Sequence, residues 1–141
     1  MASNYRNAAD GLVTILEVGI TNLKGYNHPV DNVNHFPCAI ILPEPIDPQI
    51  AFGGNTFQGA FRVVFLVSSA DSWNGFALLY DHLDPTEANK SLIKAVRADR
   101  TLNGMVDSSD VDRIENIGRR ELWGAFYFSY DAIISFIKTV A

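Results

Sequence analysis

Apolar residues recur at three- and four-residue steps near the start of the chain, and this spacing predicts an amphipathic helix over residues 4–24. Ser3 or Asn4 can cap the beginning of this helix, and Gly25 is expected to end it. The predicted buried stripe consists of Ala9, Leu12, Val13, Leu16, Ile20 and Leu23. The chain is therefore expected to begin with one long helix that buries a single face.

Short apolar runs bounded by proline and glycine follow this helix and predict strands. Residues 36–42 are too few for a helix and read as a buried strand. A second, short strand is expected to enter a Gly-Gly-Asn turn at residues 53–55. The return strand is predicted over residues 57–67, and Arg62 is its only charged residue. This region is therefore predicted to contain a hairpin.

Two helices are predicted in the middle of the chain. Ser69 or Asp71 can cap the first, and Asp84-Pro85 is expected to end it. Its apolar stripe consists of Trp73, Phe76, Ala77, Tyr80 and Leu83. The second is expected to start at Thr86 and to direct Leu92, Ile93 and Val96 inward.

The last third of the chain predicts a second hairpin, formed by residues 110–117 and 121–134 around a turn at residues 118–120. Segregated runs of strands and helices indicate an α+β fold. We expect a largely antiparallel sheet with an N-terminal helix and two central helices packed on one face. Residues 1–141 are predicted to form a single domain, with residues 135–141 as a candidate C-terminal arm.

Composition narrows the classes of function. The net charge of -5 argues against a protein that grips phosphates, because nucleic-acid affinity comes from clustered Lys and Arg. An acidic passage would instead repel DNA and let it slide without sticking. The sequence has no uninterrupted apolar window of the length needed to span a bilayer, so we expect a soluble protein made in the cytosol, with no membrane partner.

Residues that could carry chemistry are sparse. His28, His35 and His82 do not stand in a metal-ligand spacing, and Cys38 lies within an apolar run, where burial as a small hydrophobe is expected. Residues 53–55 lack the spacing of a phosphate-binding loop. We therefore expect no enzyme activity, metal or cofactor, although a site assembled from scattered residues stays open as an alternative.

Charged and aromatic residues late in the chain indicate assembly. A basic helical face is followed closely by an acidic segment, and a head-to-tail contact between identical subunits would bring the two together in a ring. The plainer interpretation is that both segments are solvated. Apolar burial must supply most of the binding energy, because exposed ion pairs contribute only about 0–1 kcal/mol each. The predicted subunit-interface residues are Lys90, Lys94, Arg97, Asp110, Asp112, Glu115, Trp123 and Tyr127.

Aromatic residues alternate along the last predicted strand. Phe126, Phe128 and Tyr130 share one face, and Trp123 and Tyr127 share the other. We expect one face to be core and the other to be covered by a neighbour. The tail after residue 131 is too apolar to hang free in water, so its removal after residue 135 is expected to affect docking more than stability.

Four phrases, in this order and spacing, resemble the tail terminator proteins of long-tailed bacteriophages. They are HFPCAIILPEP, IAFGGNTFQGAFRVVFLVSSAD, IKAVRADRTLNGMVD and LWGAFYFSYDAII, and the most specific segment is VRADRTLNGMVD at residues 96–107. The resemblance spans nearly the whole chain. It implies a six-membered ring that caps the tail tube and joins it to the head connector, with the helices outside and DNA passing through the channel.

The resemblance also implies partners and a location. The ring would contact the tail tube protein and the head connector or stopper protein, at the tail-neck junction of a virion assembled in the bacterial cytoplasm. The loop at residues 47–59 would reach toward a neighbouring ring. The predicted tube or connector contacts are Ile50, Phe52, Asn55, Phe57, Phe136 and Ile137.

Two alternatives stay open. A head-completion or stopper protein of the phage neck would share the small size and the ring assembly. A small α+β ligand-binding domain or enzyme belongs to a different class, and a strictly monomeric protein with a hydrophobic pocket would favour it.

Overall fold

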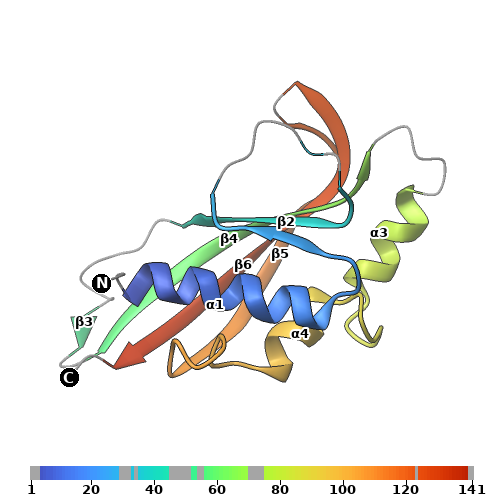
Figure 1. The fold of residues 1–141 in the computed structure, drawn as a ribbon. Helices are drawn as coiled ribbons and strands as arrows, with labels where there is room; N and C mark the ends of the chain where they lie inside the picture. Colours follow the sequence, from blue (N-terminus) through green and yellow to red (C-terminus); the bar gives the residue numbers. More distant parts are fainter. Residues whose placement is uncertain are drawn as a thin grey trace.

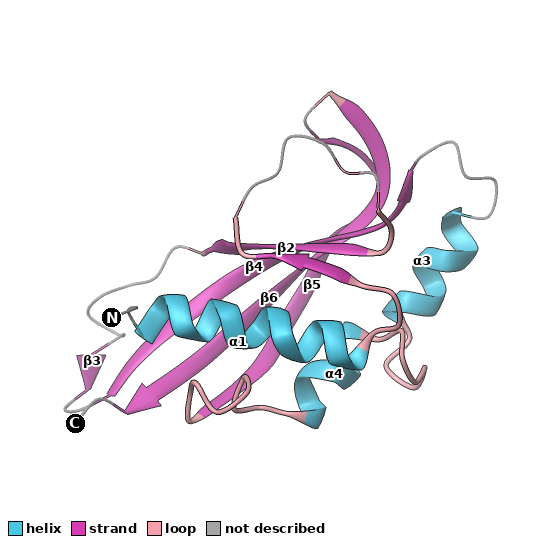
Figure 2. Cartoon of the chain, in the orientation of Figure 1, coloured by secondary structure: helices cyan, strands magenta, loops and turns pink. Residues whose placement is uncertain are grey.

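The computed structural model describes residues 4–28, 33, 35–44, 52–53, 56–69, 75–122 and 124–139, and these form an α+β fold (Figures 1 and 2). This confirms the predicted fold class. The elements in chain order are α1 (Asn4–Gly19), β1 (Lys24–Tyr26), β2 (Cys38–Pro43), β3 (Phe52–Gly53), β4 (Thr56–Ser69), α3 (Gly75–Leu83), α4 (Leu92–Ala98), β5 (Ser108–Leu122) and β6 (Ala125–Thr139).

The strands form one sheet in the order β1-β2-β4-β6-β5, and the short β3 pairs with β4. All pairs are antiparallel except β1 and β2, which are parallel. The two 15-residue strands β5 and β6 form a long hairpin, and β6 lies between β4 and β5. The middle of β6 is buried on both sides, from Tyr127 to Ile134.

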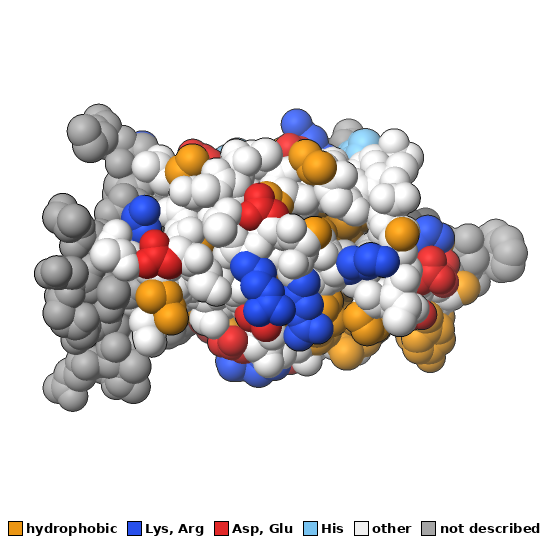
Figure 3. All heavy atoms as spheres, turned by 90° about the horizontal axis from the view of Figure 1, so that it is seen from below, with side chains coloured by type: hydrophobic (Ala, Val, Ile, Leu, Met, Phe, Trp, Pro, Cys, Tyr) orange, Lys and Arg blue, Asp and Glu red, His pale blue; other side chains and the backbone are white. Residues whose placement is uncertain are grey.

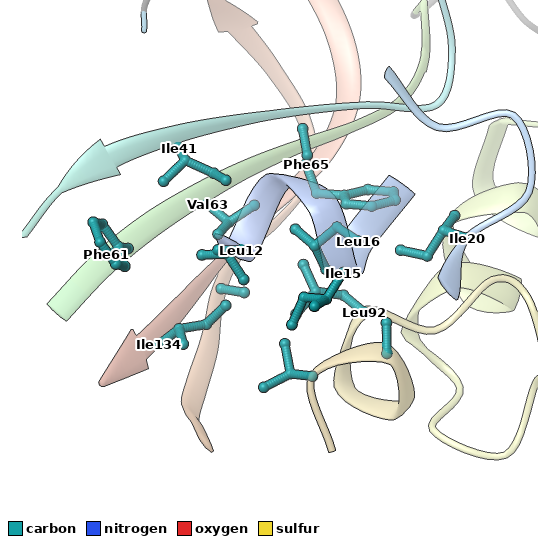
Figure 4. Close-up of a cluster of buried hydrophobic side chains, with 14 of the residues drawn as sticks. Leu12, Ile15, Leu16, Ile20, Ile41, Phe61, Val63, Phe65, Leu92 and Ile134 are labelled. Atoms are coloured by element: carbon teal, nitrogen blue, oxygen red, sulfur yellow. The ribbon is translucent and has the colours of Figure 1, made fainter. Parts of the chain in front are cut away.

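One face of the sheet, here called the first face, packs with residues of α1, α3 and α4 in a single apolar cluster. Figure 1 shows α1 lying along the sheet, and Figure 4 shows its apolar stripe directed at β4. Leu12 and Leu16 of α1 are fully buried there. The strands contribute Ala39, Ile41, Phe61, Val63, Phe65, Val67, Tyr130, Ala132, Ile134 and Phe136. Burial of this apolar surface is the main stabilising contribution of the helices.

The opposite, second face contains a smaller apolar cluster around Cys38, Ile40, Val64, Leu66 and Tyr127. The far end of the β5–β6 hairpin covers part of it, and the rings of Phe36 and Tyr127 lie 5.9 Å apart. Burial raises the pKa of the Cys38 thiol to about 11, so this thiol is an inert core group, as its apolar sequence context predicts.

The first helix is shorter than predicted. It ends at Gly19, and residues 24–26 form β1 beside β2 instead of a last helical turn. Gly19 lies against Ala95 so closely that a Cβ at position 19 would be 2.7 Å from the Ala95 Cβ. Asn22 adopts a left-handed conformation, with φ of 63°, which turns the chain toward the sheet. The helical spacing of Leu23 therefore did not predict its conformation.

The two central helices also differ from the prediction. In α3 the buried residues are Gly75, Leu79 and His82, whereas Phe76 and Tyr80 point outward. Gly75 touches the Phe128 ring, where a Cβ would come within 2.1 Å, and this contact sets which side of α3 faces the sheet. The last helix, α4, starts at Leu92 rather than Thr86, because the Ser91 hydroxyl caps it by accepting from the Lys94 amide at 3.1 Å.

Two corrections concern the C-terminal hairpin. The two strands are connected between Leu122 and Ala125, and residues 118–120 belong to β5. Gly118, with φ of 130°, sits at a β-bulge within that strand rather than in the hairpin turn. Residues 135–139 lie in β6 and pair with β4 on one side, so this stretch is part of the sheet rather than an arm.

Candidate interaction surfaces

The segment at residues 96–107, which carries the most specific resemblance, contains the last residues of α4 and the whole connection from α4 to β5. The Asp99 carboxylate accepts from the amide and the hydroxyl of Thr101, at 3.1 and 2.6 Å. Leu102, Asn103 and Gly104 then adopt left-handed conformations in succession. Leu102 is fully buried beneath α1, where a Cβ at Gly11 would lie 2.0 Å from the Leu102 carbonyl oxygen. The residues of this phrase therefore specify one tight connection.

Of the basic residues predicted to share one helical face, Lys90 and Arg97 make ion pairs within the chain, and Lys94 makes none among the described residues. Arg97 and Arg100 both contact Asp110, with N–O distances of 3.2 and 3.6 Å. Lys90 precedes α4 and lies 3.5 Å from Asp81. Seen from below, Lys and Arg side chains gather near the middle of the molecule, beside hydrophobic side chains (Figure 3). Exposed pairs of this kind contribute about 0–1 kcal/mol each.

The predicted acidic residues are also held locally, on β5. Burial alone would raise the pKa of Asp110, but the bonds from the Val111 amide and Arg97 hold it below its usual value. Asp112 accepts a hydrogen bond from the Ser135 hydroxyl at 2.8 Å. Glu115 pairs with Arg62 and Arg113, and these bonds lower its pKa. Of the predicted basic and acidic interface residues, the structure joins only Arg97 and Asp110 directly.

A charged network on the second face was not predicted from the sequence. At its centre Asp131, 1% exposed, accepts from Arg62 at 2.7 Å, Arg120 at 2.9 Å and Asn116 at 2.9 Å. Arg62 also pairs with Glu44 at 2.8 Å and with Glu115 at 2.6 Å. The bond to Glu44 is the largest of several contacts that raise the pKa of Arg62, so its guanidinium is always charged.

This network fixes the long hairpin over the sheet. Arg62 is the only charge in β4, and Asp131 is the only carboxylate in β6. Arg120 lies near the far end of the hairpin and reaches back to Asp131. The sequence signal for this network was a single charged residue in an apolar strand, because a buried charge needs a partner. The partner itself depends on the β4–β6 register, which a single sequence does not reveal.

Aromatic rings are exposed where α3 meets the long hairpin. Phe76 is 54% exposed, Tyr80 67% and Phe126 43%. Phe76 contacts the Phe128 ring at 4.7 Å between centroids, and the Arg119 guanidinium lies 4.2 Å from the centre of the Phe126 ring. We call Phe76, Tyr80, Phe126 and Arg119 the aromatic patch. Large exposed apolar groups that cluster in this way mark interaction surfaces.

Several predicted contact residues are core residues or lie outside the described residues. Tyr127 is 6% exposed and Phe136 is 1% exposed, so within the chain neither offers a surface to a partner. The neighbouring strands bury both side chains, and the alternation of residues along one strand does not predict which strands lie beside it. Ile137 is 42% exposed. The backbones of Phe52 and Phe57 pair in the β3–β4 hairpin. Trp123, Ile50 and Asn55 lie outside the described residues.

A small cleft of about 260 Å³ lies between α1 and β2. Its lining residues are Tyr5, Arg6, Ala9, Asn27, Ile41, Pro43 and Phe61. The Tyr5 hydroxyl donates to the Ala60 carbonyl at 2.6 Å, which ties the start of α1 to β4. The cleft is smaller than the roughly 300–1,000 Å³ of ordinary ligand pockets.

Within the described part of the chain, no group of His, Cys, Asp and Glu side chains is arranged to hold a metal ion. No helix among the described residues has the length and apolarity needed to cross a membrane. The sequence matches no protein-family model and no curated protein.

Proposed function

We propose that this protein is a structural virion protein that forms a ring on the tail tube of a long-tailed phage and joins it to the head connector. DNA would pass through the channel of the ring without sequence-specific contacts. The observation that carries the proposal is the ordered resemblance of four phrases to tail terminator proteins. These phrases include β2, β4, most of α4 and most of β6, which are elements of one connected fold.

The surface of the chain supports a role in assembly. The aromatic patch leaves three large rings partly exposed to solvent, and aromatic and Arg residues are enriched in protein–protein interfaces. The tight connection at residues 96–107 positions α4 against α1 and β5. An α+β subunit with an exposed aromatic surface is better suited to assembly into a ring than to binding a substrate.

The test is reconstitution with the tail tube protein and the portal complex of the virus that encodes the chain. We expect the protein to copurify with the tube, and negative-stain images to show it as an additional layer at one tube end. Capture by the portal complex without the tube would indicate a stopper protein instead. A protein that binds neither complex would contradict both neck functions.

A further inference from the structure

Most charged side chains near the predicted interface already have partners within the chain, which narrows the groups left for a neighbour. Among the described residues, Arg119 has no carboxylate partner and stacks on Phe126. Asp112 has no cationic partner there and accepts only from Ser135. Arg97, Arg100 and Glu115 are in intrachain pairs. Arg119 and Asp112 are opposite in sign, and Lys94, Glu121 and Lys138 likewise make no ion pair among the described residues.

Arg119 and Asp112 each lie beside exposed apolar surface. Arg119 belongs to the aromatic patch, on the same side of the hairpin as Phe126. Asp112 is bound to Ser135, which lies two residues before Ile137 on the same face of β6. Ile137 is 42% exposed and pairs with Gln58, which is also exposed. We call Ile137, Ser135, Gln58 and Asp112 the Ile137 surface.

The two surfaces lie at opposite ends and on opposite faces of β6. Phe126 is near the beginning of the strand and Ile137 is near its end, eleven residues later. At about 3.3 Å per residue, they are separated by roughly 36 Å along the strand. Alternation along the strand places Phe126 with the first face and Ile137 with the second. A contact between the aromatic patch of one copy and the Ile137 surface of another would therefore join two different patches, which makes it head-to-tail.

We propose that the aromatic patch of one copy binds the Ile137 surface of the next copy, with Arg119 opposite Asp112. This inference rests on the proposed ring, since it names the contact between its subunits. Phe76, Tyr80 and Phe126 supply the apolar burial, and the charge pair sets the register of the two copies. Repetition of an identical head-to-tail contact closes a ring when the rotation between copies permits it.

Sedimentation velocity over a concentration series tests the proposal with Tyr80→Asp and Ile137→Asp, one variant for each surface. We expect the wild-type chain to assemble and each variant to associate at least about tenfold more weakly. An equimolar mixture of the two variants should form a dimer and stop there, because each retains one intact surface. Val18→Asp is the matched control, since Val18 is apolar, 82% exposed and outside both surfaces.

A charge exchange gives a second test that does not depend on apolar substitutions. Arg119→Glu and Asp112→Arg should each weaken assembly, and the two combined in one chain should restore it. A wild-type chain that stays monomeric at the highest concentration would overturn the proposal, as would a Tyr80→Asp or Ile137→Asp chain that assembles like wild type. Tube binding is measured separately, so a ring that ignores the tube would contradict the proposed function alone.

Discussion

On the first face of the sheet, residues of α1, α3 and α4 meet an almost entirely apolar set of strand side chains. On the second face, a small apolar cluster lies beside three arginines and three carboxylates, namely Arg62, Arg113, Arg120, Glu44, Glu115 and Asp131. Buried apolar side chains tolerate small changes in their relative positions. A buried ion pair is stabilising only when its geometry is close and all of its charged groups are paired. The first face therefore supplies most of the stability, and the second sets the position of the long hairpin.

The largest expected effect comes from removing residues 136–141. This truncation shortens β6, whose side chains contribute to both faces of the sheet. Phe136 is 1% exposed and stacks on Phe61, so its loss alone should cost about 3–5 kcal/mol. This reverses the expectation that the tail affects docking more than stability. Urea denaturation measures the unfolding free energy. A truncated chain as stable as wild type would show that the end of β6 is not core.

The second face is tested by Asp131→Ala. This change leaves Arg62 and Arg120 without their shared buried carboxylate, and we expect a loss of about 3–5 kcal/mol. Asp112→Ala is the control, because Asp112 is exposed and binds only Ser135, and it should cost less than about 1 kcal/mol. Equal effects of the two changes, measured by urea denaturation, would mean that the network does not hold the hairpin.

A smaller effect concerns pH and the first face. Burial lowers the pKa of His82, although its Nδ1–H donates to the Lys90 carbonyl at 2.8 Å. In the unfolded chain, His82 has its ordinary pKa near 6.5. At pH values between this pKa and the lower folded pKa, the unfolded chain therefore binds the proton more readily than the folded chain does. Stability should fall as pH drops from about 7.5 through 6.5 toward the folded pKa.

Thermal unfolding of His82→Asn checks this pH dependence, because the amide keeps a donor and does not titrate. The slope of melting temperature against pH should flatten in this variant. If His82→Asn retains the full slope, other groups are responsible.

The smallest effect is expected at the surface pairs of α4. Arg97→Ala removes one exposed contact to Asp110, while Arg100 still pairs with that carboxylate. The unfolding free energy should change by less than about 1 kcal/mol, and less still at high salt. A loss of unfolding free energy as large as that of Asp131→Ala would mean that the α4 ion pairs are among the main stabilising contacts. The charged groups of the surface and of the second face would then not differ in their contribution to stability.

The sequence by itself determined the α+β class, the start of α1, and the strands around residues 38–43 and 56–69. These follow from local information, because apolar periodicity, caps and proline boundaries act within a few residues. Even the most specific phrase, at residues 96–107, is a local connection built from Asp, Thr, Asn and Gly.

Only the tertiary structure decided where α1 ends, which side of α3 is buried, and what Arg62 contacts. Arg62 and Asp131 are separated by 69 positions, and they meet because β4 and β6 pair in one register. Phe76 and Tyr80 fit a buried stripe by spacing, yet the contact of Gly75 with Phe128 turns them outward. Local periodicity is compatible with several strand registers and several buried helix faces. The pairing of distant strands and close side-chain packing determine which of them forms.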